Sequence, residues 1–289
     1  MAALDPRLHA YREDLADLRL KGVVRALRYA PGETKRVIAD VAAIRKAPAS
    51  DASLTSEALR GETVRVFEET AEGWAWGQLE TDGYVGYFPS DALSANGAEP
   101  THRITALHAF VYPGPDMKLP ARGGLPLSAH VAITGEATTR GTTYALLAGG
   151  EGAIIAAQAV PIEAPPEADF VAVAQRFLNA PYLWGGRTSF GLDCSALVQL
   201  SLAEAAVSAP RDTDLQEQAL GTSVAPDARS VHRGDLVFWR GHVGIMLDGE
   251  YMLHASGFHA SVVIEPLVEA VARIAERGGG AVSSVRRLQ

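Results

Sequence analysis

One cysteine in a chain of 289 residues stands at the start of a predicted helix, and this placement constrains the chain most. After Cys194, apolar side chains recur with a helical period at Leu197, Val198 and Leu202. Asp193 is therefore predicted to be the N-cap, with Cys194 as the first helical residue. The free backbone N–H groups and the dipole at that end of a helix favour a thiolate. The pattern is typical of a nucleophile held at a helix N-terminus.

A lone cysteine is more often a small buried apolar residue than a catalytic one. Here two histidines strengthen the catalytic interpretation, because His242 and His254 lie on adjacent predicted strands at 242–247 and 251–256. A two-residue hairpin loop would place the two imidazoles on opposite faces of the sheet, whereas a three-residue loop at 248–250 would place them on the same face. We therefore predict a three-residue loop or a bulge between these strands.

The catalytic hypothesis gives each residue a role. His242 is expected to take the thiol proton and to lower the pKa of Cys194 into the range of roughly 3.5 to 7.5. His254 would orient His242, as Asp or Asn does in other triads. The Cys194 backbone N–H and the Tyr182 hydroxyl are the candidate donors to the oxyanion. Attack on a carbonyl, a thioester intermediate and release by water would make the protein a hydrolase.

The rest of the chain divides at a proline-bearing segment without periodicity, residues 162–168. Upstream, short predicted strands alternate with turn signals, and the pattern recurs at an offset of about 67 residues, so we predict two tandem barrels. Downstream, a helix hairpin and an antiparallel sheet predict an α+β catalytic domain. The predicted parts are an N-terminal helical or irregular segment at 1–35, barrels at 36–97 and 98–163, and the catalytic domain at 164–289.

Composition excludes several classes of function. The net charge of -8 argues against a large nucleic-acid surface. No apolar run reaches the roughly 18 residues of a membrane helix, so no membrane insertion is expected. With no leader segment visible and a single cysteine, we expect a cytoplasmic protein without an internal disulfide. No cofactor or metal is expected, because His232 and His259 lie outside any ligand spacing.

Residues 166–289 resemble the NlpC/P60 family of cell-wall cysteine peptidases, which have a papain-like fold. The matching segments, in chain order, are Pro181-Tyr182-Leu183-Trp184-Gly185-Gly186, Asp193-Cys194-Ser195, Arg211-Asp212-Thr213, Gly234-Asp235-Leu236-Val237-Phe238-Trp239, Gly241-His242-Val243-Gly244-Ile245 and Leu253-His254-Ala255. One departure is Ala196, where the family commonly has glycine. Alanine is small and a better helix former, so we expect little effect.

Two bacterial SH3-like barrels before such a domain resemble the subgroup that cleaves the γ-D-glutamyl bond to a diamino acid in peptidoglycan stem peptides. The resemblance implies a substrate with a free N-terminal L-alanine and a role in murein recycling. It also implies the residues that bind this substrate, namely Asp193, Ser195 and Trp184 in the catalytic domain, and Tyr84 with Glu68 or Glu62 in the first barrel. An ammonium group needs such acceptors and negative charge.

Two other functions stay open at this point. The barrels could grip peptidoglycan while the peptidase domain is inert, although the presence of Cys194, His242 and His254 argues against this. An amidase or acyltransferase could use the same fold and the same three residues. The aromatic residues of the first barrel are also more often core than ligand platform in such small domains.

Overall fold

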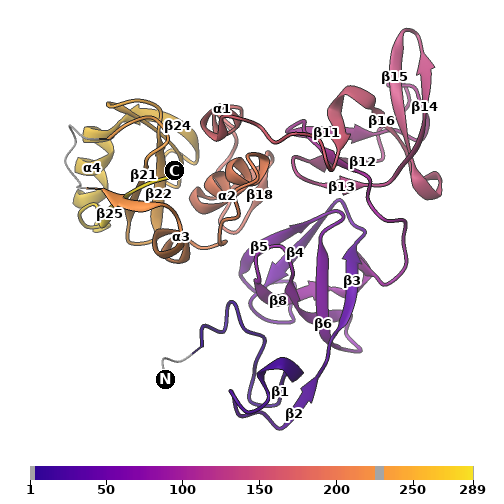
Figure 1. Ribbon diagram of the computed structural model, residues 1–289, viewed down its shortest axis with the longest axis horizontal. Coiled ribbons are helices and arrows are strands. Elements are labelled where there is room, and N and C mark those ends of the chain that lie inside the picture. The colour runs from indigo at the N-terminus through magenta and orange to yellow at the C-terminus, as the bar shows by residue number, and fades with distance from the viewer. Residues whose placement is uncertain (1–3, 225–230, 289) are drawn as a thin grey trace. The chain divides into compact units, whose positions relative to one another are not determined.

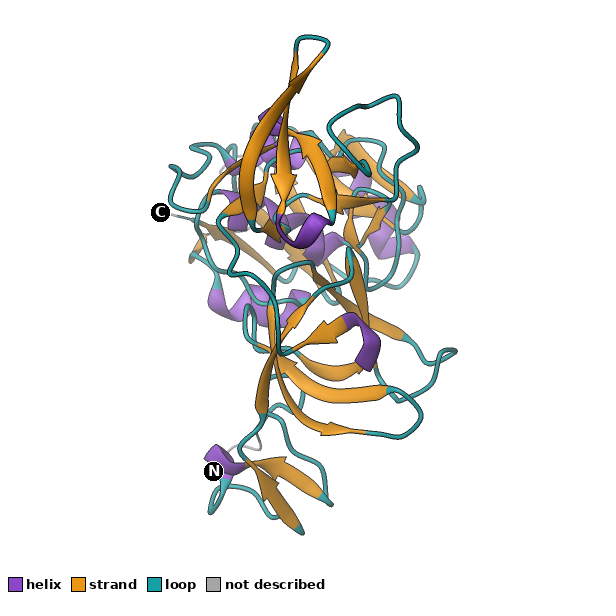
Figure 2. Ribbon diagram, turned by 90° about the vertical axis from the view of Figure 1, so that its right-hand side faces the viewer, coloured by secondary structure: helices purple, strands orange, loops and turns teal. Residues whose placement is uncertain are grey.

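The computed structural model describes residues 4–224 and 231–288, and the chain folds into two compact units, residues 1–164 and 165–289 (Figure 1). The boundary falls within the proline-bearing segment 162–168. Strands dominate both units and helices are few, as Figure 2 shows. In the described part of the chain, every helix is too short or too polar to cross a bilayer.

The N-terminal segment, predicted to be helical or irregular, contains no α-helix between residues 4 and 30. Strand β1, Leu15–Asp17, pairs in parallel with β2, Arg28–Ala30, and a short 3-10 helix, Leu18–Leu20, follows β1. The apolar side chains of this segment do not form one face of a helix. They pack instead in a small cluster against the first barrel. This cluster joins Ala10 and Leu15 to Phe67 and Trp76.

The first barrel is a seven-stranded sheet with the order β5-β4-β8-β7-β6-β3-β9. Its strands are β3 Glu33–Val37, β4 Val41–Arg45, β5 Leu54–Leu59, β6 Thr63–Glu69, β7 Trp74–Leu79, β8 Val85–Pro89 and β9 Leu93–Ser94. Residues 38–40 separate β3 from β4. Alternating buried residues such as Val64, Leu79 and Phe88 fill the core.

The second all-β body repeats this order of elements. Its strands are β10 His102–Ile104, β11 His108–Val111, β12 Gly123–Pro126, β13 His130–Val131, β14 Ile133–Thr139, β15 Thr142–Leu147, β16 Gly152–Ile155 and β17 Ala159–Pro161. Strand β4 begins at Val41 and β11 at His108, while β8 begins at Val85 and β16 at Gly152, so both pairs are 67 residues apart. The predicted offset of about 67 residues thus recurs at these two pairs of strands.

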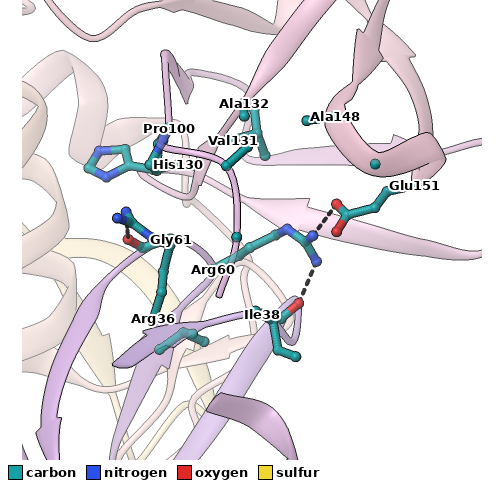
Figure 3. A pocket seen from close by; sticks show the side chains of 14 residues that line it. Arg36, Ile38, Arg60, Gly61, Pro100, His130, Val131, Ala132, Ala148 and Glu151 are labelled. Carbon is teal, nitrogen blue, oxygen red and sulfur yellow. Dashed lines mark hydrogen bonds and ion pairs between the residues drawn. The ribbon is translucent and has the colours of Figure 1, made fainter. Parts of the chain in front are cut away.

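Polar contacts hold the two all-β bodies together. Asp40 Oδ2 accepts from the Gly124 amide at 2.9 Å, and the His130 amide donates to the Arg60 carbonyl at 2.8 Å. Figure 3 shows the Arg60 side chain reaching across the junction to Glu151, beside a cavity of about 180 Å³. The arginines that line this cavity already have carboxylate partners in the protein.

The second unit, which carries the predicted catalytic residues and is called the catalytic unit below, is built on a six-stranded sheet with the order β20-β25-β21-β22-β23-β24. The strands are β20 Thr222–Val224, β21 Leu236–Trp239, β22 His242–Met246, β23 Tyr251–Ser256, β24 Ser261–Pro266 and β25 Ser284–Arg287. A small hairpin of β18, Arg187–Thr188, and β19, Gly191–Leu192, precedes the cysteine. Strands β22 and β23 lie within the predicted strands at 242–247 and 251–256, whereas β20 and β24 were not predicted.

In the described part of this unit, four helices pack around the sheet. They are α1 Phe170–Gln175, α2 Cys194–Glu204, α3 Thr213–Ala219 and α4 Leu267–Glu276. Helix α4 covers the sheet face that carries Val237, Trp239 and Met246. Helix α2 packs against β22 and β23 from the other side (Figure 1), and this packing sets the position of its first turn.

The packing at the junction between the all-β bodies can be tested by comparing two glycines with the same backbone conformation. Gly61 and Gly73 have φ of 85° and 86°, which costs an L-residue about 1–2 kcal/mol. A Cβ at Gly61 would lie 2.5 Å from His130, whereas a Cβ at Gly73 meets nothing. Gly61→Ala should therefore lower the free energy of unfolding by about 1–3 kcal/mol more than Gly73→Ala. Calorimetry of the full chain measures both, and equal losses would contradict tight packing at this junction.

Candidate active site

The cysteine lies where the sequence predicts it. Asp193 is the N-cap of α2, its carboxylate accepts from the Ala196 amide at 2.9 Å, and Cys194 is the first helical residue. The methyl group of Ala196 is fully buried, so the helix accommodates it in place of glycine. The Cys194 side chain itself is only 5% exposed.

The Asp193 carboxylate is the centre of a buried network. Oδ1 accepts from the Ala196 amide, from Ser195 Oγ at 3.1 Å and from Arg211 Nη1 at 2.9 Å. Oδ2 accepts from the Gly185 amide at 2.9 Å and from Arg211 Nη2 at 2.7 Å. Burial alone would raise the pKa of Asp193, but the charge and hydrogen bonds of Arg211 outweigh it and the pKa is lowered. The carboxylate is therefore ionised and well satisfied.

The stretch from Pro181 to Gly186 folds tightly against the residues before the cysteine. The Leu183 amide donates to the Leu192 carbonyl at 3.1 Å. A Cβ at Gly186 would lie 2.3 Å from the Gly191 carbonyl oxygen, so only glycine permits this approach. The Gly185 amide can therefore reach Asp193.

The side chains of Tyr182 and Trp184, both in this stretch, lie in different surroundings. Tyr182 is partly buried, and burial together with the nearby Cys194 and Asp193 raises the pKa of its phenol. The hydroxyl therefore stays protonated and can donate a hydrogen bond. Trp184 is 66% exposed, and its proposed contact with substrate stays a prediction.

The two histidines lie on the same side of the sheet, as predicted. Ile245 pairs with Leu253, and the Leu247 amide donates to the Tyr251 carbonyl, so three residues form the loop. This confirms the predicted three-residue loop. His242 Nε2 lies 2.7 Å from His254 Nδ1, within hydrogen-bond distance.

The thiol contacts the strand that carries the first histidine. The Val243 amide, which directly follows His242, donates a hydrogen bond to the Cys194 sulfur. The Thr213 hydroxyl at the start of α3 lies 3.8 Å from the same sulfur. Helix α2, strand β22 and helix α3 thus all reach the thiol.

The predicted low pKa of the thiol is wrong for the resting protein. Burial, and then the charge of Asp193, raise the pKa of Cys194 to about 11, although the Val243 amide opposes them. Burial, followed by the charge of His254, lowers the pKa of His242 to about 3. The helix N-terminus does favour a thiolate, but an ionised carboxylate at the N-cap and the loss of water act against it. At neutral pH the pair is a thiol and a neutral imidazole.

Sequence reasoning missed a carboxylate behind the second histidine. Glu265 on β24 accepts from His254 Nε2 at 2.6 Å, and Arg273 of α4 forms an ion pair with it. His259 Nε2 lies 3.7 Å from the other carboxylate oxygen. The available signal was an acidic residue that ends an apolar run, Val262 to Ile264, before a proline.

The candidate residues of the first barrel have structural contacts of their own. Tyr84 is 5% exposed and belongs to the barrel core. Glu68 forms ion pairs with Arg12, at 2.5 Å, and with Arg28. Glu62 accepts from the Leu59 amide at 2.6 Å. Their roles in substrate binding stay predictions.

The other two histidines of this unit, His232 and His259, have polar neighbours within it. His232 Nδ1 lies 2.7 Å from an Arg287 nitrogen, and His259 lies beside Glu265. Within residues 4–224 and 231–288, no three His, Cys, Asp or Glu side chains gather closely enough to hold a metal ion.

Two family models match the chain, one in each unit. Residues 44–93 match a bacterial dipeptidyl-peptidase SH3 domain, and residues 179–274 match the NlpC/P60 family. A solved structure of an NlpC/P60 family protein from Bacillus cereus has the same fold, with a TM-score of 0.70 and 20% identity over 88% of this chain and 99% of that one. The predicted fold class is confirmed.

Two curated relatives extend the similarity. The gamma-D-glutamyl-L-lysine dipeptidyl-peptidase of Bacillus cereus is 27% identical over 240 residues, which cover 74% of this chain and 71% of the relative. The protein of the same name from Bacillus subtilis is 33% identical over 132 residues, which cover 42% of this chain and 44% of the relative.

The contribution of the buried Asp193–Arg211 ion pair to folding stability can be measured. Arg211 is 1% exposed, so Arg211→Met would leave the Asp193 carboxylate buried without its countercharge. We expect the free energy of unfolding to fall by about 3–5 kcal/mol. Arg240→Met, at an exposed arginine of the same unit, is the control. Urea denaturation of the full chain compares them, and similar losses would mean that the pair stabilises little.

The resting protonation state is testable by alkylation. Because Cys194 is the only cysteine, consumption of iodoacetamide reports a single thiol. With a pKa of about 11, the rate should keep rising from pH 8 to pH 10, about tenfold per pH unit, as the thiolate fraction grows. The urea-unfolded chain, with a thiol pKa of about 8.5, should level off near pH 9 to 10. A plateau in the folded protein between pH 5 and 8 would instead show a preformed thiolate.

Proposed function

Because the chain is a cysteine peptidase with an NlpC/P60 domain and a bacterial SH3 domain, and Cys194 is its only cysteine, we propose that Cys194 is the nucleophile. The observation that carries the proposal is the placement of this thiol. It lies in the first turn of α2 and receives a hydrogen bond from the amide next to His242.

In the proposed reaction, the thiol proton moves to His242 as the sulfur attacks the carbonyl carbon, because both groups are neutral at rest. The Cys194 amide and the Tyr182 hydroxyl donate to the oxyanion. Collapse of the tetrahedral intermediate breaks the C–N bond, and the His242 imidazolium gives its proton to the leaving amine. Water then hydrolyses the thioester, with His242 again as base, and restores the thiol.

The proposed substrate is a peptidoglycan stem peptide with a free N-terminal L-alanine, cleaved between γ-D-glutamate and the diamino acid. Two relatives named gamma-D-glutamyl-L-lysine dipeptidyl-peptidase support this choice. A dipeptidyl-peptidase releases two residues from the N-terminus, so the free amine defines where it cuts. The products would be L-Ala-γ-D-Glu and a peptide that begins with the diamino acid.

Amine recognition is proposed for Asp193, Ser195, Tyr84 and Glu68. An ammonium group is held by acceptors with uncompensated negative charge. The Asp193 carboxylate already pairs with Arg211, and Glu68 pairs with Arg12 and Arg28. Selection of the amine is therefore the part of the proposal that the substrate experiment must test first.

A requirement for a free amine would restrict the enzyme to peptides already detached from glycan strands. We therefore propose that it acts in murein recycling, after other enzymes have released the stem peptide. Such peptides are met in the cytoplasm, which is the proposed location.

The substrate proposal is tested with a matched pair of peptides. Purified protein should cleave L-Ala-γ-D-Glu-diaminopimelate, whereas N-acetylation should lower kcat/KM by at least about 100-fold, if the amine contributes about 3 kcal/mol. Chromatography and mass spectrometry identify the released L-Ala-γ-D-Glu. Cys194→Ala should abolish cleavage.

Each contrary outcome overturns a different part of the proposal. Equal cleavage of both peptides would remove the amine requirement. No cleavage of either would favour an inert binding protein or another reaction. Activity that persists in Cys194→Ala would remove the nucleophile assignment.

A further inference from the structure

We propose that Glu265 is a positioning residue that sets the tautomers of both imidazoles, so that His242 presents a bare Nδ1 as the base. This rests on the proposed function only in taking His242 as the base. The geometry that carries it is a continuous line of short hydrogen bonds, from Glu265 through His254 to His242.

The sheet register places this carboxylate behind His254. His254 pairs with Val263 on β24, and Glu265 follows Val263 by two residues, so its side chain points to the same face. The His254 and Glu265 side chains are 1% and 11% exposed. Their 2.6 Å contact is therefore shielded from water, and no bulk solvent competes for the His254 nitrogen.

An ionised carboxylate can only accept hydrogen bonds. Burial would raise the pKa of Glu265, but the hydrogen bond from His254 and the charge of Arg273 outweigh it, so the group is ionised. His254 Nε2 must then carry the proton. Burial lowers the pKa of His254, so this ring is neutral and its Nδ1 has a free lone pair.

The tautomer of His254 in turn constrains His242. His254 Nδ1 can only accept, so His242 Nε2 must be the donor across the 2.7 Å contact. His242 is neutral as well, because burial lowers its pKa. Its single proton is thus on Nε2, and Nδ1 is left as the lone pair that can take a proton from a thiol. One carboxylate fixes two tautomers in series.

Arg273 holds the carboxylate in this position. It comes from α4, forms an ion pair with Glu265, and lies 4.9 Å above the Phe258 ring. Its positive charge also offsets the tendency of Glu265 to make the imidazoles more basic. His259 is the other titratable group at the carboxylate, 3.7 Å from Oε2.

A merely structural ion pair would predict something different. Glu265→Gln keeps the shape of the side chain, but its amide can present either an oxygen or an NH₂ group to His254. Both tautomers of His254, and hence of His242, then become available. If Glu265 only tied β24 to α4, this change would lower stability without altering the protonation pattern of folded protein.

The first measurement needs no substrate and no variant. Long-range ¹H–¹⁵N spectra of the ¹⁵N-labelled full chain at pH 7 report which nitrogen of each imidazole carries the proton. We expect His242 and His254 both to be protonated on Nε2 and bare on Nδ1. A proton on Nδ1 of either ring would overturn the proposal. This result is independent of whether the stem peptide is the true substrate.

The second measurement compares Glu265→Gln with Glu269→Gln, which removes an exposed carboxylate from the neighbouring helix α4. We expect Glu265→Gln to mix the tautomers in the NMR spectra and to lower kcat about 10–100-fold while KM changes less than about 2-fold. The Glu269→Gln control should leave both constants and the spectra unchanged. A folded Glu265→Gln protein with wild-type tautomers and wild-type kcat would overturn the proposal. Failure of wild-type protein to cleave the stem peptide would instead count against the proposed function.

Discussion

The buried ion pair between Asp193 and Arg211 is the interaction on which the catalytic unit depends. A carboxylate buried without a countercharge would cost several kcal/mol, so the two residues must come together when the unit folds. Their contacts join the start of α2 to the Pro181–Gly186 stretch and to the loop that leads into α3. The position of Cys194 follows from this junction, because the same carboxylate caps the helix that begins with it.

Charge around the thiol is arranged in two balanced pairs. Asp193 is matched by Arg211 on the side of the cysteine, and Glu265 is matched by Arg273 behind the histidines. Between these pairs, Cys194 is buried, His242 is partly buried, and both are neutral at rest. In the proposed reaction, charge is therefore separated only when the thiol attacks, and the proposed oxyanion donors would stabilise it then.

Local features of this site were predictable from the sequence, whereas features that depend on distant packing were not. The N-cap at Asp193 and the three-residue loop before Tyr251 follow from neighbouring residues and strand parity alone. Glu265 was missed because the sequence of β24 is a short apolar run without alternation. Its register with β23 therefore could not be inferred from the sequence. The thiol pKa was wrong because a helix dipole can be inferred locally, while the burial that outweighs it comes from the whole unit.

If the Asp193 carboxylate is chiefly an anchor for the nucleophile, its charge should matter first for folding. Asp193→Asn keeps the size of the side chain, removes the charge that balances Arg211 and replaces one of the two accepting oxygens with an NH₂ donor. The free energy of unfolding of this variant is therefore the most direct measurement. We predict a loss of about 3–5 kcal/mol relative to the wild-type chain. Stability within about 0.5 kcal/mol of wild type, with the preference for free-amine peptides lost, would instead identify Asp193 as a residue for substrate recognition.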